Sequence, residues 1–111
     1  MKKYILIIPA AGIIFACRKD VDQSIDCSGT PKSFAADVTP IFQSSCATDL
    51  DCHSNGSNSG PGPLVNYTQI FNSRVLIRQA VLSGEMPQDK KLSSAEKNTI
   101  LCWIDNGAAN N

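Results

Sequence analysis

The chain's single histidine directly follows a cysteine, and another cysteine lies shortly upstream, in the segment Cys46-Ala47-Thr48-Asp49-Leu50-Asp51-Cys52-His53. Such a donor set is typical of covalent haem attachment, in which each thiol adds to a haem vinyl group and the imidazole reaches the iron. The common motif has two residues between the thiols, whereas this C-x5-C-H segment has five. We expect thioethers from Cys46 and Cys52 with His53 as an iron ligand. A single thioether from Cys52 is the alternative.

Two other chemistries use the same residues. Cys46 and Cys52 could close a small disulfide loop, or the thiols and the imidazole could bind zinc. Structural zinc sites normally have four protein ligands, often as two close pairs. The candidates left for such a set are Cys27 and Cys102, which lie far away in the sequence. We therefore favour haem attachment.

The first residues have the pattern of a secretory signal. Lys2 and Lys3 form a basic start, and residues 4–16 form an uncharged, largely apolar run. This run is shorter than the ~20 residues that span a bilayer. Its end, Ile14-Phe15-Ala16-Cys17, resembles the lipobox of bacterial lipoproteins. We expect removal of residues 1–16, lipidation of Cys17 and export to a membrane surface. Ordinary cleavage near Ala16 with a plain thiol at Cys17 is the alternative.

The mature chain has room for one small domain. Removing 16 of the 111 residues leaves 95, of which residues 17–32 are polar and turn-rich and read as a lipidated tether. Residues 33–111 form the expected domain. Without Lys2 and Lys3 the chain keeps 8 of its 10 basic side chains against 10 acidic ones, and no basic stripe indicates nucleic acid.

With Cys17 assigned to lipid and the two thiols of the C-x5-C-H segment to haem, Cys27 and Cys102 are left. Disulfides persist in exported compartments, so we expect these two cysteines to pair. Two unpaired thiols are the alternative.

Periodic apolar residues predict helices on both sides of a loop. One helix should run from Ser33 to about Ser45, with a kink at Pro40 or a regular part that begins with Thr39 as its cap. The Gly- and Pro-rich residues 54–63 must form a loop. There, a backbone carbonyl such as that of Pro61 or Pro63 could accept the ring N–H of His53.

The second half of the chain predicts further helices. Residues 67–83 form one helix or two that meet near Asn72-Ser73, and Gly84 ends them. In the last helix Ser93 and Glu96 form a capping box. Between these helices lies Gly84-Glu85-Met86-Pro87, whose methionine is the only one outside the signal. We expect Met86 to be the second axial ligand of the iron, and a core-filling methionine is the alternative.

In this order the motifs resemble the small class I c-type cytochromes and, more closely, the haem-binding lipoprotein domains of Bacteroidetes. The matching segments are residues 37–42 (DVTPIF), Cys46 with Cys52-His53, Leu64 and Tyr67, residues 84–87 (GEMP) and residues 103–108 (WIDNGA). The resemblance covers residues 34–109. It implies an all-α, cytochrome c-like fold of three to four helices around one covalently attached haem c.

We therefore expect a mono-haem electron carrier, tethered to a membrane by its lipid anchor, that exchanges electrons with redox protein partners and has no catalytic site of its own. One alternative is a haem-free, disulfide-stapled lipoprotein module that binds a protein or a sugar. The other is a haem protein that binds a small ligand in place of Met86.

Overall fold

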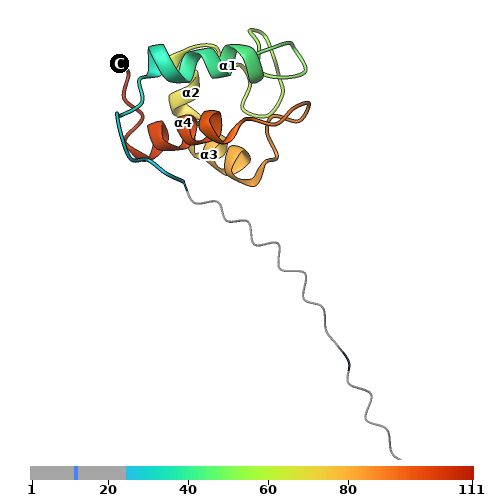
Figure 1. The fold of residues 1–111 in the computed structure, drawn as a ribbon. Helices are drawn as coiled ribbons and strands as arrows, with labels where there is room; N and C mark the ends of the chain where they lie inside the picture. The colour runs from blue at the N-terminus through green and yellow to red at the C-terminus, as the bar shows by residue number, and fades with distance from the viewer. Residues whose placement is uncertain (1–11, 13–24) are drawn as a thin grey trace, which may run out of the picture.

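The computed structural model describes residue 12 and residues 25–111, and Figure 1 shows their arrangement. The expected signal peptide, the lipidation site Cys17 and the first part of the tether lie outside the described residues. In chain order the elements are η1 (Phe34–Val38, a π-helix), α1 (Thr39–Ser45), α2 (Tyr67–Asn72), α3 (Arg74–Ser83) and α4 (Ser94–Asp105). Residues 25–111 contain no β-strand, in agreement with the predicted all-α class.

Pro40 divides the first predicted helix into two parts. A regular α-helix would need an N–H at position 40, which proline lacks. Ahead of it, the chain forms wider turns in which Val38 donates to the carbonyl of Ser33 at 3.1 Å. The Thr39 side chain likewise donates to the Phe34 carbonyl, at 2.9 Å. Thr39 is thus the first residue of α1, with Pro40 in its first turn, and not the cap that the sequence suggested.

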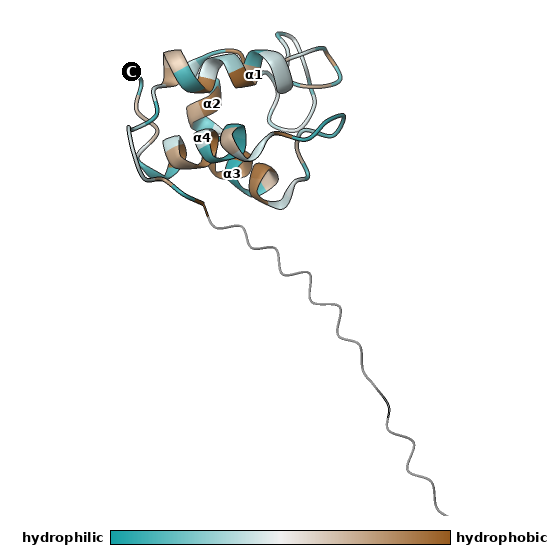
Figure 2. Cartoon of the chain, in the orientation of Figure 1, coloured by the Kyte–Doolittle hydropathy of each residue, from teal (hydrophilic) through white to brown (hydrophobic). Residues whose placement is uncertain are grey.

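The core lies where η1, α3 and α4 pack together. Each helix in Figure 2 carries both hydrophobic and hydrophilic stretches, as expected of helices that cover a core on one side. Trp103, only 1% exposed, is the largest of the fully buried side chains. Its aromatic neighbours are Phe34 and Tyr67, with ring centroids 5.5 and 6.4 Å away. The Trp103 and Tyr67 side chains donate to the carbonyls of Ala109 and Ala108, so they also hold the C-terminal residues against the core.

Of the two alternatives that the sequence left for residues 67–83, one helix or two, the structure has two. Ser73 ends α2 and precedes α3, and the Asn66 side chain caps the start of α2 by accepting from Gln69 N at 3.0 Å. Gly84, with φ of 79°, ends α3 in the left-handed conformation that glycine adopts most readily. The capping box of Ser93 and Glu96 is also present at the start of α4.

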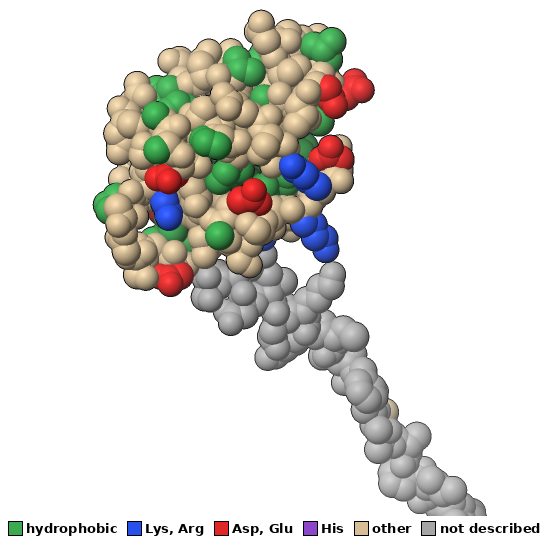
Figure 3. Space-filling view, turned by 45° about the horizontal axis from the view of Figure 1, so that its top comes forward, with side chains coloured by type: hydrophobic (Ala, Val, Ile, Leu, Met, Phe, Trp, Pro, Cys, Tyr) green, Lys and Arg blue, Asp and Glu red, His purple; other side chains and the backbone are tan. Residues whose placement is uncertain are grey.

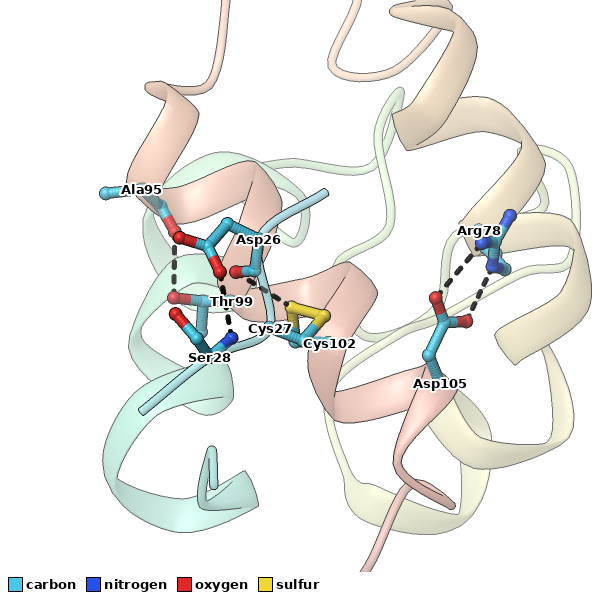
Figure 4. Close-up of a disulfide and its surroundings, with 8 residues drawn as sticks. All are labelled: Asp26, Cys27, Ser28, Arg78, Ala95, Thr99, Cys102 and Asp105. Carbon is cyan, nitrogen blue, oxygen red and sulfur yellow. Dashed lines mark hydrogen bonds and ion pairs between the residues drawn. A yellow bond between two sulfur atoms is a disulfide. The ribbon is translucent and has the colours of Figure 1, made fainter. Parts of the chain in front are cut away.

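A disulfide fastens the segment ahead of η1 to α4. Cys27 and Cys102 are joined with their Cα atoms 5.3 Å apart, as the assignment of the cysteines predicts. Figure 4 shows the bond between the extended segment and the helix, with the Asp26 carbonyl close to the Cys102 sulfur. Ile25 packs against the core, so packing includes part of the expected tether ahead of Ser33.

On the face shown in Figure 3, acidic and basic side chains are interspersed with apolar ones. One exposed ion pair joins two helices: Arg78 of α3 donates to Asp105 of α4 at 2.7 Å (Figure 4). In the part of the chain that the structure describes, no helix is both long enough and apolar enough to cross a membrane.

Candidate functional site

The segment from Cys46 to His53 forms a closed loop at the end of α1. Cys46 donates its backbone N–H to the carbonyl of Phe42, which continues the helical pattern into the loop. At the other end, the N–H of His53 donates to the carbonyl of Cys46 at 3.0 Å. This bond returns the chain to its starting point, so the pair Cys52-His53 lies beside Cys46 despite the five intervening residues.

His53 is buried, with 8% of its surface exposed, and its ring is fixed by a backbone carbonyl. Nδ1 lies 2.9 Å from the carbonyl oxygen of Gly62. In a neutral imidazole this bond assigns the proton to Nδ1 and leaves the lone pair on Nε2. No described residue makes a hydrogen bond to Nε2. A buried imidazole with one nitrogen fixed and the other unpartnered is suited to metal ligation.

The loop of residues 54–63 supplies this carbonyl, as the sequence predicts, but the acceptor is Gly62 and not Pro61 or Pro63. Two further bonds hold the loop against the histidine. Gly62 donates to the carbonyl of Ser59 at 2.8 Å, and Leu64 donates to the carbonyl of His53 at 2.9 Å. With φ of 88°, Gly62 has a backbone conformation that a side chain would strain, and this turn aims its carbonyl at the ring.

Two adjoining hollows meet at three of the predicted site residues. One has a volume of about 310 Å³ and the other about 270 Å³, and both are lined by Cys46, His53 and Met86. The first hollow also includes Cys52 and polar residues of both loops. The second is bounded by apolar residues from α1, α3 and the loop between them, namely Phe42, Pro61, Leu64, Leu76, Ile77, Ala80 and Val81. All four predicted haem-binding residues therefore border this pair of hollows.

Met86 is brought to the site by the turn that follows α3. Its backbone N–H donates to the carbonyl of Ala80 at 3.1 Å, which folds the turn back on the helix. From the far side of the same turn, the Lys90 ammonium donates to the carbonyl of Ser44 at 2.8 Å. This contact joins the turn to the end of α1, immediately before Cys46. Met86 and Cys46 thus come from different parts of the chain to line the same two hollows.

The two thiols of the loop are free, whereas the other two cysteines of the described chain form the disulfide. Burial raises the pKa of the Cys46 thiol to about 11 from an ordinary 9.0, so this thiol keeps its proton at neutral pH. The disulfide also removes Cys27 and Cys102 from the zinc set that the sequence left open. Within residues 25–111, no three His, Cys, Asp or Glu side chains are grouped as a metal site.

On sequence grounds, the broad apolar surface of residues 67–83 could face either a haem plane or other helices. In the structure this surface contributes Leu76, Ile77 and Val81 to the second hollow. One feature of the site was not predicted from the sequence, namely Asp49, whose carboxylate accepts the backbone N–H of Cys52 at 3.0 Å. Its signal was an aspartate three residues before a cysteine, a spacing at which the side chain can accept a hydrogen bond from the turn that follows.

No protein-family model, curated protein or solved structure matches the chain. The donors at the two hollows are two thiols, an imidazole with a free Nε2 and a thioether. This set fits a haem that is bound covalently through the thiols and ligated by the imidazole and the thioether.

Proposed function

We propose that the protein is a membrane-tethered mono-haem c-type cytochrome that carries single electrons between redox partners. One observation carries the proposal: Cys46, His53 and Met86 border both hollows, and Cys52 borders one of them. These are the residue types that covalent haem attachment and His/Met ligation require. They come from two separate loops, and His53 and Met86 are 33 positions apart in the sequence.

Each residue then has a separate role. Cys46 and Cys52 would hold the haem through thioethers, and His53 and Met86 would ligate its iron. The Gly62 carbonyl fixes the His53 ring and leaves Nε2 as the nitrogen that would bind the iron. Apolar residues of α1 and α3 would line one side of the haem. When bound, the haem supplies a reversible one-electron change at its iron.

This assignment favours electron transfer over catalysis. With His53 and Met86 both as ligands, protein side chains would occupy the iron, and the haem so held would supply one-electron transfer at a raised reduction potential. The contacts of Met86 N–H with Ala80 and of Lys90 with Ser44 hold the methionine turn in place. A partner would therefore exchange electrons with a haem whose ligands stay bound, and we propose no catalytic site for this chain.

The location of the protein is part of the proposal. A signal peptide over residues 1–16 and a lipid on Cys17 would anchor it to a bacterial membrane, on the periplasmic side or the cell surface, with redox proteins as partners. The disulfide of Cys27 and Cys102 is consistent with export, because such bonds persist in oxidising compartments.

A visible spectrum combined with the mass of the denatured protein tests the proposal. The full chain is produced in a bacterial host that has the maturation machinery for c-type haem. We expect a c-type spectrum and a mass that includes haem after denaturation, because thioethers survive unfolding. A variant with Cys46→Ala and Cys52→Ala is the matched control and should lose the covalent haem. A colourless wild-type protein with Cys46 and Cys52 joined in a disulfide would support the stapled binding module instead.

A further inference from the structure

The five residues between the two thiols form an ordered turn, and Asp49 makes most of its contacts. The N–H of Cys52 lies 3.0 Å from the Asp49 carboxylate and 3.2 Å from the Asp49 carbonyl. The same carbonyl accepts the N–H of Ser54 at 3.1 Å. Asp49 thus contacts the chain on both sides of His53, and its side chain fixes the backbone of Cys52 directly.

The rest of the loop is anchored at its ends and at Asp51, whose carbonyl accepts the Ser59 hydroxyl at 2.8 Å. On one side, the N–H groups of Cys46 and Ala47 both donate to the carbonyl of Phe42, at 3.0 and 2.8 Å. On the other side, His53 is fixed by its bonds to Cys46 and Gly62. Among the side chains of residues 47–51, Asp49 makes the one hydrogen bond that the described structure gives to the Cys52 backbone. Loss of the Asp49 carboxylate would remove this side-chain bond and leave the turn to its remaining backbone contacts, among them the Asp49 carbonyl with the N–H groups of Cys52 and Ser54.

A long spacing between two thiols carries a cost in conformational entropy, and the Asp49 hydrogen bond reduces this cost. A flexible loop of five residues samples many conformations, and few of them place both thiols at one space. A side-chain hydrogen bond to the backbone selects a turn from this ensemble. In the structure both thiols border the same 310 Å³ hollow.

We propose that Asp49 is a positioning residue that orders the five-residue loop, so that both Cys46 and Cys52 form thioethers. The inference rests on the proposed haem attachment. In each thioether step the sulfur forms a bond to one carbon of a vinyl group, the vinyl π bond is lost and the thiol proton ends on the other vinyl carbon. The addition needs no oxidant or reductant. Its reactants are a divinyl haem and two reduced thiols.

The loop contains a matched control at Asp51. Asp49 and Asp51 are both exposed and have the same side chain, but the structure gives the Asp51 carboxylate no hydrogen bond among the described residues. Asp51→Ala removes a charge from the same loop and keeps the Asp51 carbonyl, which accepts the Ser59 hydroxyl. A conservative variant, Asp49→Asn, keeps an oxygen that can accept the N–H of Cys52.

The experiment counts thioethers in haem-containing full-length protein. Wild type, Asp49→Ala, Asp49→Asn and Asp51→Ala are produced in the host with haem maturation, denatured without reductant and treated with iodoacetamide. Peptide mapping then shows whether Cys46 or Cys52 is alkylated, which marks a thiol that formed no thioether. The pyridine haemochrome spectrum is an independent readout, because a remaining vinyl group stays conjugated with the porphyrin and moves the α band to longer wavelength.

We expect two thioethers in the wild type, in Asp49→Asn and in Asp51→Ala. Asp49→Ala should show a roughly fivefold increase in singly attached haem, since one net hydrogen bond corresponds to about that factor. A shifted haemochrome band with rescue by Asp49→Asn distinguishes positioning from a general loss of stability. A single thioether in the wild type, or equal effects of Asp49→Ala and Asp51→Ala, would overturn the inference while leaving haem attachment intact. Wild-type protein without haem would overturn the proposed function as well.

Discussion

Removing the disulfide between Cys27 and Cys102 should destabilise the protein strongly. The bond closes a loop with a sequence separation of 75 residues. In the chain-entropy model, a loop of this length stabilises the folded state by roughly 4 kcal/mol, because the cross-link restricts the unfolded chain. A domain of this size typically has 5–15 kcal/mol in total, so the loss is a large fraction of its stability. We expect the variant with Cys27→Ala and Cys102→Ala to unfold at much lower denaturant concentration.

Guanidinium unfolding followed by far-UV circular dichroism measures this loss. Wild type is compared with the double variant and with wild type reduced by dithiothreitol, which leaves thioethers unaffected. The two forms without the disulfide should agree to within about 1 kcal/mol, the remainder being the packing of the Cys102 side chain, which is 2% exposed. The dependence of the unfolding free energy on guanidinium concentration should be steeper in both forms without the disulfide. An unfolded chain without the cross-link exposes more surface to the denaturant.

The reasoning would be refuted by a loss of less than about 1 kcal/mol in both forms when mass spectrometry shows an intact disulfide in the wild type. A large loss in the double variant with almost none on reduction would point to packing at Cys102 as the cause. In that case the loop-closure account would be wrong and the bond would add little beyond the buried contact.

Three further predictions concern the apoprotein, the last helix and the haem-containing protein. Burial raises the pKa of the Cys46 thiol to about 11, so in the apoprotein the unfolded state loses this proton at lower pH than the folded state. The free energy of unfolding should therefore fall by on the order of 2–3 kcal/mol between pH 9 and pH 11. Cys46→Ala should not show this fall. Ser93→Ala should lower the unfolding free energy by about 1 kcal/mol through loss of the cap, whereas Ser94→Ala should leave it nearly unchanged in the same denaturant titration. Met86→Leu should lower the reduction potential and permit carbon monoxide binding without denaturation; an unchanged spectrum and potential would exclude Met86 as a ligand.

Much of the helical framework follows from local sequence. The end of α3 at Gly84 and the capping box at Ser93 depend on residues within a few positions of one another. Such contacts form in any fold that keeps the helix, so pattern and capping rules detect them. The wider turns ahead of Pro40 were harder to predict, because the missing N–H allows either a kink or a different hydrogen-bond pattern.

The candidate site also has parts that the sequence predicts and parts that it leaves open. The sequence identified Cys46, Cys52, His53 and Met86 as a set of donors, since their types and spacing have few chemical uses. It did not decide which carbonyl holds His53, because the choice among Pro61, Gly62 and Pro63 depends on how the whole loop turns. The role of Asp49 was also undetermined, because an exposed aspartate in a polar loop has many possible partners.

The sequence by itself determined the all-α class, the end of α3 at Gly84, the capping box of α4, the pairing of Cys27 with Cys102 and the residue types available for chemistry. Only the tertiary structure decided that the loop after α1 and the turn after α3 border the same two hollows. The physical reason is that local patterns depend on neighbours along the chain, whereas a shared cavity depends on how buried helices pack. Here, the packing of α3 against α4 and the Lys90 contact with Ser44 bring Met86 to the loop that carries His53.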